Sequence, residues 1–252
     1  VVLRVNRLKI NPKILQKELT LEGFNLVSHP SYPDALILKE RANVFDTESF
    51  QKGFFEVQDA SSQLVGYFAE VSPGMQVIDT CAGAGGKSLH LAALMENKGQ
   101  LTALDIYSHK LHELKRRARR AGAHNITIRQ ISSNKVIKKL QNHADRVLID
   151  APCTGLGVLR RNPDAKWKID ADFLERVKQT QQQILTAYAP MVKPGGKLIY
   201  STCSILKEEN QEQVEEFLKS PKGTEFNLEK DHFISPAKSG FDGFYMARMI
   251  RS

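Results

Sequence analysis

The sequence predicts an α/β fold: a doubly wound, mostly parallel sheet of seven strands, preceded by a small α+β domain. From about Met75 onward, short apolar segments alternate with segments of helical spacing. Strands joined by helical crossovers form parallel sheets that are covered on both faces. The first part of the chain instead alternates strand, helix and strand. We therefore expect one domain over residues 1–57 and a second over residues 58–252.

Seven apolar segments are the strand candidates of the larger domain. They are Met75–Asp79, Gln100–Ile106, Ile126–Ile131, Arg146–Ile149, Gly196–Ser201, Glu225–Leu228 and Phe244–Ile250. Apolar residues at helical spacing predict the helices between and after them. These are Lys87–Met95, His109–Ala121, Lys135–Leu140, Phe173–Met191 and Glu208–Leu218.

The small domain is predicted from three shorter segments. Leu3–Asn6 and Ala35–Lys39 have the pattern of strands, and Pro12–Glu22 has that of a helix. Asn11 is a favourable N-cap for this helix, and a proline suits its first position. The chain then continues into a further helix, Ala60–Glu70, which we assign to the larger domain.

The composition is that of a globular protein and narrows its partners. Of the 252 residues 41% are hydrophobic and 25% charged, and no apolar run is long enough to cross a bilayer. The net charge of +8 favours nucleic acid as a partner over a membrane surface. Three cysteines are too few for a disulfide framework, so we expect a reducing, cytoplasmic location. The chain starts at Val1, within a predicted strand, and we expect it to be cut from a longer protein.

A glycine-rich turn is the first candidate site. Asp79–Lys87 runs from a strand through the turn into a helix, which lets backbone approach a nucleotide-like ligand closely. Asp105, at the end of the next strand, is placed to bind a ribose diol. Together they predict an adenosine-containing cofactor. The alternative is that Gly83, Gly85 and Gly86 only form a tight turn.

Two cysteines form the second candidate site. Cys153 lies in Asp150–Gly155 and Cys203 in Ser201–Ser204, and both segments follow predicted strands. The carboxyl ends of neighbouring parallel strands share one crevice, so the two thiols would face a single pocket. A buried apolar role or a regulatory disulfide remain alternatives, and for Cys81 we favour packing. Paired metal-ligand spacing is lacking, so we expect no metal.

These motifs resemble a known family. The segments that carry the resemblance are Val57–Gln63, Asp79–Ser88, Asp150–Gly155, Ser201–Ile205 and Asp242–Phe244. They resemble successive motifs of the RsmB/Nop/Sun family of RNA cytosine-5 methyltransferases, which implies a class I methyltransferase (Rossmann-like) fold. Gly157–Asp164, followed by Lys166 and Trp167, is similar to the bacterial RsmB branch, which acts on 16S rRNA. Family members carry a small RRM-like domain ahead of the catalytic one, matching residues 1–57, and the RsmB branch has a helical RNA-binding domain before both.

The resemblance implies a mechanism and a role for each catalytic residue. Carbon 5 of cytosine is too weak a nucleophile to take a methyl group unless a thiolate first adds to carbon 6. Cys203 would be the attacking thiol and Cys153 would promote its release. Asp150 would hydrogen-bond the polar edge of the cytosine. Lys87 could lower the pKa of the thiol by its charge.

S-adenosylmethionine is the cofactor that the resemblance implies. Its expected binding residues are Cys81, Ala82, Gly83, Ala84, Gly85, Gly86, Lys87, Asp105, Ser132 and Asp150. Ser132 stands where the family usually has an acid, and its hydroxyl would accept a weaker hydrogen bond.

The RNA is expected to contact basic residues near the cysteines and on the small domain. These are Arg160, Arg161, Arg4 and Arg7. We expect a monomer that binds RNA, with 16S rRNA as substrate. The alternatives are a tRNA methyltransferase, a DNA cytosine methyltransferase in which Cys153 attacks, and a non-catalytic RNA-binding protein of ribosome assembly.

Overall fold

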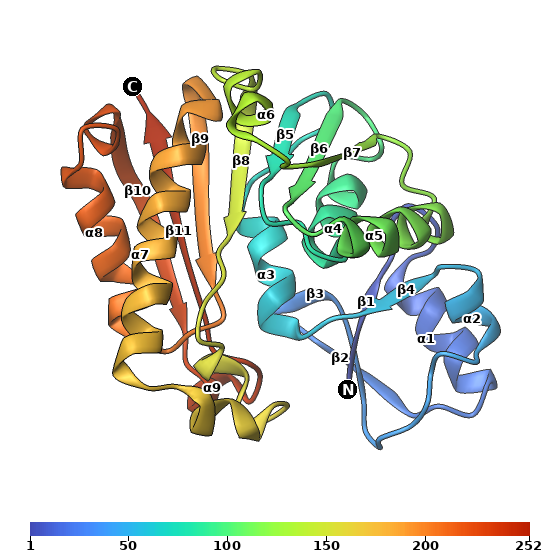
Figure 1. The fold of residues 1–252 in the computed structure, drawn as a ribbon. Coiled ribbons are helices and arrows are strands. Elements are labelled where there is room, and N and C mark those ends of the chain that lie inside the picture. Colours follow the sequence, from blue (N-terminus) through green and yellow to red (C-terminus); the bar gives the residue numbers. More distant parts are fainter.

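The computed structural model describes residues 1–252, with every side chain except that of Lys168. The backbone forms a four-stranded sheet near the N-terminus and a seven-stranded sheet in the rest of the chain. Figure 1 shows the two sheets side by side, with α3 between them.

The seven-stranded sheet has the order β10-β11-β9-β8-β5-β6-β7. Its strands are β5 (Gln76–Asp79), β6 (Gln100–Asp105), β7 (Ile126–Gln130), β8 (Ala144–Asp150), β9 (Val192–Thr202), β10 (Phe226–Ile234) and β11 (Phe244–Arg251). The four pairs from β9 to β7 are parallel. Strand β11 runs antiparallel to β9, and β10 runs antiparallel to β11. The sheet is therefore mostly parallel, as the sequence predicts.

Helices cover both faces of this sheet. They are α3 (Ala60–Phe68), α4 (Gly86–Leu94), α5 (Ser108–Ala121), α6 (Asn134–Lys138), α7 (Ala171–Tyr188), α8 (Gln211–Lys219) and α9 (Pro236–Ser239). Helices α3, α4 and α5 contribute to one apolar core, which includes Leu91 and Leu114. Helices α7 and α8 contribute to the core on the other face, with Leu185 and Phe217. Two buried layers around one sheet define a doubly wound α/β fold, as the sequence predicts.

The N-terminal residues form a separate antiparallel sheet of order β2-β3-β1-β4. Its elements are β1 (Val2–Val5), α1 (Pro12–Leu21), β2 (Leu26–His29), β3 (Tyr32–Leu38), α2 (Glu48–Gln51) and β4 (Phe55–Val57). Asn11 caps α1 by accepting from the Ile14 amide at 3.0 Å, as expected. Strands β2 and β4 were not among the predicted elements.

Both faces of strand β1 are buried. Leu3 and Val5 pack into the core of the small domain, under α1. Val2 lies on the opposite face, against Ala60 at the start of α3. The start of α3 therefore packs against that face of the four-stranded sheet.

Candidate active site

The structure brings Cys153 and Cys203 together at the carboxyl ends of β8 and β9. The two strands are parallel neighbours, with Asp150 paired to Ser201. After these two residues each strand continues into a loop. The sulfur atoms of Cys153 and Cys203, which lie in these loops, are 3.2 Å apart. A disulfide bond is about 2.05 Å long, so these are free thiols in hydrogen-bond contact.

Lys87 and Asp150 form an ion pair beside the thiols. The Lys87 ammonium nitrogen lies 2.6 Å from Asp150 Oδ2, and the lysine side chain is 10% exposed. Ser201 donates its hydroxyl to Asp150 Oδ1 at 3.1 Å. Because both carboxylate oxygens are engaged, the Asp150 side chain has a fixed orientation.

The two thiols differ in their electrostatic surroundings. The pKa of Cys203 is lowered, first by the hydrogen bond from Cys153 and also by the charge of Lys87. The pKa of Cys153 is raised well above the ordinary value, first by its hydrogen bond to Cys203, then by burial and by the charge of Glu209. The surroundings thus favour a thiolate at Cys203 and a thiol at Cys153.

Three loops pack closely around the cysteines, and this close packing requires glycines, which have no Cβ atom. The Gly157 amide donates to the carbonyl oxygen of Cys203 at 2.9 Å, and the Gly243 amide donates to the carbonyl of Gly157 at 2.8 Å. A Cβ atom on Gly157 would lie 2.2 Å from the Gly243 carbonyl oxygen. Beside it, Asp242 is buried and accepts from Arg161 Nε at 2.9 Å. These contacts give the Asp242–Phe244 motif a structural basis.

A cavity of about 580 Å³ opens at the glycine-rich turn. Its lining residues are Gln58, Ser62, Asp79, Thr80, Cys81, Ala82, Gly83, Ala84, Gly86, Lys87, Asp105, Ile106, Tyr107, Lys110, Asp150, Pro152, Thr180, Ile184 and Tyr188. Lys87 and Asp150 line this cavity and also influence the thiol pair, so the two candidate sites adjoin. The volume is in the range of small-ligand pockets.

The cavity has the charges expected around a cationic nucleoside ligand. Three acidic residues, Asp79, Asp105 and Asp150, face two ammonium groups, Lys87 and Lys110, and burial raises the pKa of Asp79 to about 7. Asp79 accepts from Ser88 at 2.6 Å through Oδ2, while its buried Oδ1 has no hydrogen-bond partner among the described residues. An unsatisfied buried carboxylate oxygen is costly unless a ligand donates to it. S-adenosylmethionine carries an ammonium and a sulfonium group, and these residues fit it.

Asp105 organises the far side of the turn. Its Oδ2 accepts from the Gly83 amide and its Oδ1 from the Tyr107 amide, each at 2.8 Å. Gly83 has φ +54°, in the left-handed region that favours glycine. Each carboxylate oxygen can accept a second hydrogen bond, so Asp105 can also bind a ribose hydroxyl.

Two expected cofactor residues do not line the cavity. Gly85 packs against α5, because a Cβ atom on it would lie only 2.7 Å from Leu114 Cγ. Ser132 is exposed and lies outside the cavity wall. The loop that carries it starts beside the cavity, since the Ile131 amide donates to the Asp105 carbonyl at 2.9 Å, and a role for Ser132 with the cofactor stays a prediction. Cys81 does line the cavity, and burial raises its pKa, so it is a poor thiolate.

Several lining residues were missed by the sequence reasoning. Ile106 and Tyr107 directly follow Asp105 and are about half-exposed, a signal that could have been used. Thr180, Ile184 and Tyr188 come from α7. Their spacing of four residues places them on one helix face, but this spacing is also that of an ordinary buried stripe.

The four arginines expected to contact RNA have different surroundings. Arg4 is 3% exposed and donates to the Gln58 side chain and the Gly86 carbonyl. The expectation that it contacts phosphate is wrong, because its guanidinium is buried between the domains. Arg7 pairs with Asp34 and is partly exposed.

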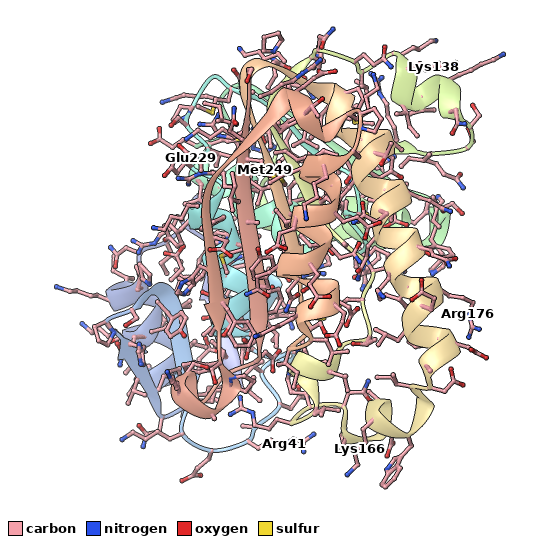
Figure 2. All side chains as sticks on the ribbon, turned by 90° about the vertical axis from the view of Figure 1, so that its left-hand side faces the viewer. Arg41, Lys138, Lys166, Arg176, Glu229 and Met249 are labelled. Carbon is pink, nitrogen blue, oxygen red and sulfur yellow. The ribbon has the colours of Figure 1, made fainter. Side chains whose placement is uncertain are left out.

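Arg160 and Arg161 line a second cavity, of about 680 Å³, between the small domain and the loop after Cys153. Its other lining residues are Val1, Val2, Ile37, Leu38, Arg41, Val57, Gln58, Asp59, Gly240 and Phe241. Figure 2 labels Arg41 and Lys166, which lie at the same end of the molecule. Gln58 lines both cavities, so the second adjoins the first.

The fold and site define a class I methyltransferase with two thiols beside a nucleoside-type cavity. The chain belongs to the 16S rRNA methyltransferase RsmB/F family, whose sequence profile matches residues 68–250.

The curated relatives agree with this membership. The chain is 35% identical over 263 residues to the probable ribosomal RNA small subunit methyltransferase B of Bacillus subtilis, with 98% of the chain and 59% of the relative covered. It is also 35% identical over 238 residues to the ribosomal RNA small subunit methyltransferase B of Salmonella paratyphi B, with 91% and 54% covered. The chain thus spans less than two thirds of the length of these relatives.

Solved structures share the fold over the whole chain. The crystal structure of a protein named PH0851 superposes with a TM-score of 0.93 at 32% identity, covering 100% of this chain and 59% of that protein. The structure of NSun6 from Pyrococcus horikoshii with SFG superposes with a TM-score of 0.90, covering 99% and 90%. At 22% identity the latter likeness shows the fold alone.

Two further features have no candidates among the described residues. None of the helices in the described part of the chain combines the length and apolar character that a bilayer crossing needs. Among the side chains that the structure describes, no group of three His, Cys, Asp or Glu residues is arranged to hold a metal ion.

Proposed function

We propose that the protein transfers a methyl group from S-adenosylmethionine to carbon 5 of a cytosine in 16S rRNA. The observation that carries the proposal is the thiol pair, with sulfur atoms 3.2 Å apart, next to the cavity at the glycine-rich turn. One thiol is sufficient to add to carbon 6 of the ring. A second thiol at this distance suits a reaction whose covalent adduct must also be resolved.

Cys203 is the attacking residue in this proposal. Its surroundings favour the thiolate, which is the nucleophilic form. Addition forms a bond from the sulfur to carbon 6 and moves electron density toward carbon 5 and ring nitrogen 3. Asp150 is oriented by Lys87 and Ser201 to hydrogen-bond the polar edge of the cytosine. As a carboxylate, Asp150 accepts hydrogen bonds from the cytosine amino group and from a proton taken up from water at ring nitrogen 3, which stabilises the charge that builds there.

Cys153 acts after methyl transfer. A base removes the proton from carbon 5, the bond from carbon 6 to the Cys203 sulfur breaks, and the ring regains its double bond. The raised pKa of Cys153 keeps it protonated at neutral pH, so its S–H donates a hydrogen bond that stabilises the departing Cys203 thiolate. S-adenosylmethionine supplies an electrophilic methyl group, and its holding residues would be Asp79, Asp105 and the glycine-rich turn.

The second cavity is where we place the RNA strand. Arg160 and Arg161 line it together with Arg41 of the small domain, and guanidinium groups suit phosphate. The target base must leave its stack to reach the thiols. The small domain has the element order β-α-β-β-α-β, which supports an RRM-like fold for residues 1–57. One face of its sheet is covered by α3, so that face is not an open platform for stacking bases.

The test is a pair of cysteine variants incubated with 16S rRNA and S-adenosylmethionine. Cys203→Ala should abolish methyl transfer and adduct formation. Cys153→Ala should leave a protein–RNA adduct that survives denaturing electrophoresis, because release is blocked. The opposite assignment of adducts would show that Cys153 attacks, as in DNA cytosine methyltransferases. Absence of S-adenosylmethionine binding by calorimetry at millimolar cofactor would refute an enzymatic function.

A further inference from the structure

Glu209 is a buried carboxylate with no role in the mechanism described above. It ends a turn of 3-10 helix, Lys207–Glu209, and is 0% exposed. Thr154 donates to it twice, from the amide at 2.8 Å and from the hydroxyl at 2.5 Å. Gln181 donates at 3.1 Å, and the Ser204 hydroxyl donates as well. All of these donors are neutral, so the negative charge is buried against dipoles rather than a cation, an arrangement that is expensive to maintain.

Two of these donors, Thr154 and Ser204, come from the two loops that carry the cysteines, and Gln181 comes from α7. Thr154 directly follows Cys153, and Ser204 directly follows Cys203. One carboxylate therefore bonds both loops at the residue next to each thiol. The backbone of Glu209 is itself fixed, because the hydroxyl of Tyr200 in β9 donates to its carbonyl at 2.8 Å.

The charge of Glu209 acts unequally on the two thiols. It is among the groups that raise the pKa of Cys153. The charged groups that act on Cys203 are Lys87, which lowers its pKa, and Asp150 and Asp242, which raise it.

The groups that face the pair come from every surrounding element. They are Lys87 of α4, Asp150 of β8, Tyr200 of β9, Glu209 of the turn, and Asp242 and Arg161 of the adjoining loops. Among them, Glu209 is the carboxylate that raises the pKa of Cys153, whereas on Cys203 the cation Lys87 is opposed by the carboxylates of Asp150 and Asp242. Glu209 therefore acts on the proton of Cys153 rather than on that of Cys203.

We propose that Glu209 is a positioning residue that joins the two cysteine loops and selects Cys203 as the thiolate by keeping the proton on Cys153. The inference rests on the proposed function for its purpose, but the selection of one thiol is a property of the protein alone. It can be measured without RNA or S-adenosylmethionine.

The substitution Glu209→Gln removes the charge and can keep the network. The amide oxygen can accept from the Thr154 amide and Gln181, as Oε1 does now. The amide nitrogen can donate to the hydroxyls of Thr154 and Ser204, which rotate to accept. We therefore expect this variant to fold. Glu208→Gln is the matched control, because Glu208 is the preceding residue of the same turn and is only half-buried. Glu209→Asp keeps the charge and shortens the side chain.

The experiment measures alkylation by iodoacetamide, in which a thiolate displaces iodide, across pH 6 to 10. Cys153 and Cys203 lie in different tryptic peptides, Val147–Arg160 and Leu198–Lys207, so mass spectrometry gives a rate for each. A carboxylate within several ångströms shifts a neighbouring pKa by about one unit or more. Glu209→Gln should therefore raise the ratio of Cys153 to Cys203 alkylation about tenfold at pH 8. Both Glu208→Gln and Glu209→Asp should keep the wild-type ratio within about twofold.

For each cysteine, the alkylation rate in the variant is compared with the rate in the wild type. This comparison cancels the difference between the two cysteines in their access to the reagent. An unchanged ratio in a folded Glu209→Gln variant would overturn the inference. So would an equal rise in Glu209→Asp, which would show that geometry rather than charge sets the ratio. If Glu209→Gln does not fold, the wild-type profile decides. Cys203 should gain reactivity at lower pH than Cys153, and the reverse order would overturn the inference. Each of these results stands apart from whether the protein methylates RNA.

Discussion

Replacement of His90 should remove an acid-sensitive contact between the two domains. His90 lies in α4, its side chain is 1% exposed, and its Nε2 is 3.1 Å from Asp34 Oδ2. Asp34 belongs to β3 of the small domain and also accepts from the Tyr67 hydroxyl at 2.7 Å. Burial lowers the pKa of His90 to about 4, from the ordinary 6.5. Neutral His90 therefore belongs to the folded state, and protonation favours unfolding.

The stability that His90 contributes is fully present above pH 6.5 and is lost as the pH falls from 6.5 toward 4. One pKa unit corresponds to about 1.4 kcal/mol. Between pH 7.5 and pH 4.5 the shift from 6.5 to about 4 predicts a loss of about 2.5 kcal/mol. Asp34 adds little in this window, because its pKa is lowered from 3.8 to about 2 and its contribution is lost mainly at lower pH.

The assay is urea unfolding of the wild type and of His90→Gln at pH 7.5 and 4.5. Glutamine can donate to Asp34 but does not titrate. The comparison is needed because burial raises the pKa of Asp79 to about 7, so acid stabilises the fold at Asp79 in both proteins alike. The wild type should lose about 2.5 kcal/mol more than the variant on going to pH 4.5. Parallel pH dependence in the two proteins would refute the reasoning.

Three further substitutions have defined outcomes. Lys87→Met removes the cation beside Asp150 and should slow single-turnover methyl transfer by about 10²-fold; a wild-type rate would contradict the role given to Lys87. Glu56→Gln leaves two partly buried arginines of α5 without their anion and should lower the free energy of unfolding in urea by about 3 kcal/mol, whereas a change below 1 kcal/mol would count against it. Gly157→Ala places a Cβ atom 2.2 Å from the Gly243 carbonyl and should lower the stability by about 1–3 kcal/mol in thermal unfolding; an unchanged melting temperature would show that the loops can separate.

All seven segments that were predicted as strands of the larger domain form strands. The central ones are apolar without interruption, and the edge strand β7 was found from its two isoleucines although it is only partly buried. Strand β10 was predicted over four residues and extends from Phe226 to Ile234, with its interior residues exposed. An exposed edge strand has no apolar run to reveal it. Strand β9 begins at Val192 rather than Gly196, since Pro194 and Gly195 resemble a turn signal although they lie within the strand.

The candidate site, too, could be predicted from the sequence only in part. Motifs at strand ends are local, so the proximity of Cys153 and Cys203 follows once β8 and β9 are taken as neighbours. The burial of Arg4 does not follow, since it depends on how the small domain packs against the glycine-rich turn. A basic residue in a basic protein fits RNA contact equally well. Whether Arg4 is buried or contacts RNA can be decided only from its contacts with residues that are far away in the sequence.

This packing gives the small domain a part in shaping the cofactor cavity. Arg4 of β1 donates to the carbonyl of Gly86, and Arg117 of α5 joins Glu56 of β4 to the carbonyl of Ala84 at 2.8 Å. Both carbonyls belong to the glycine-rich turn. Burial lowers the pKa of Arg4 to about 10, yet it stays charged at neutral pH and must keep its partners. Moving the small domain away would leave buried charges unpaired. In the proposed function, RNA in the second cavity would therefore contact a surface that packs directly against the turn.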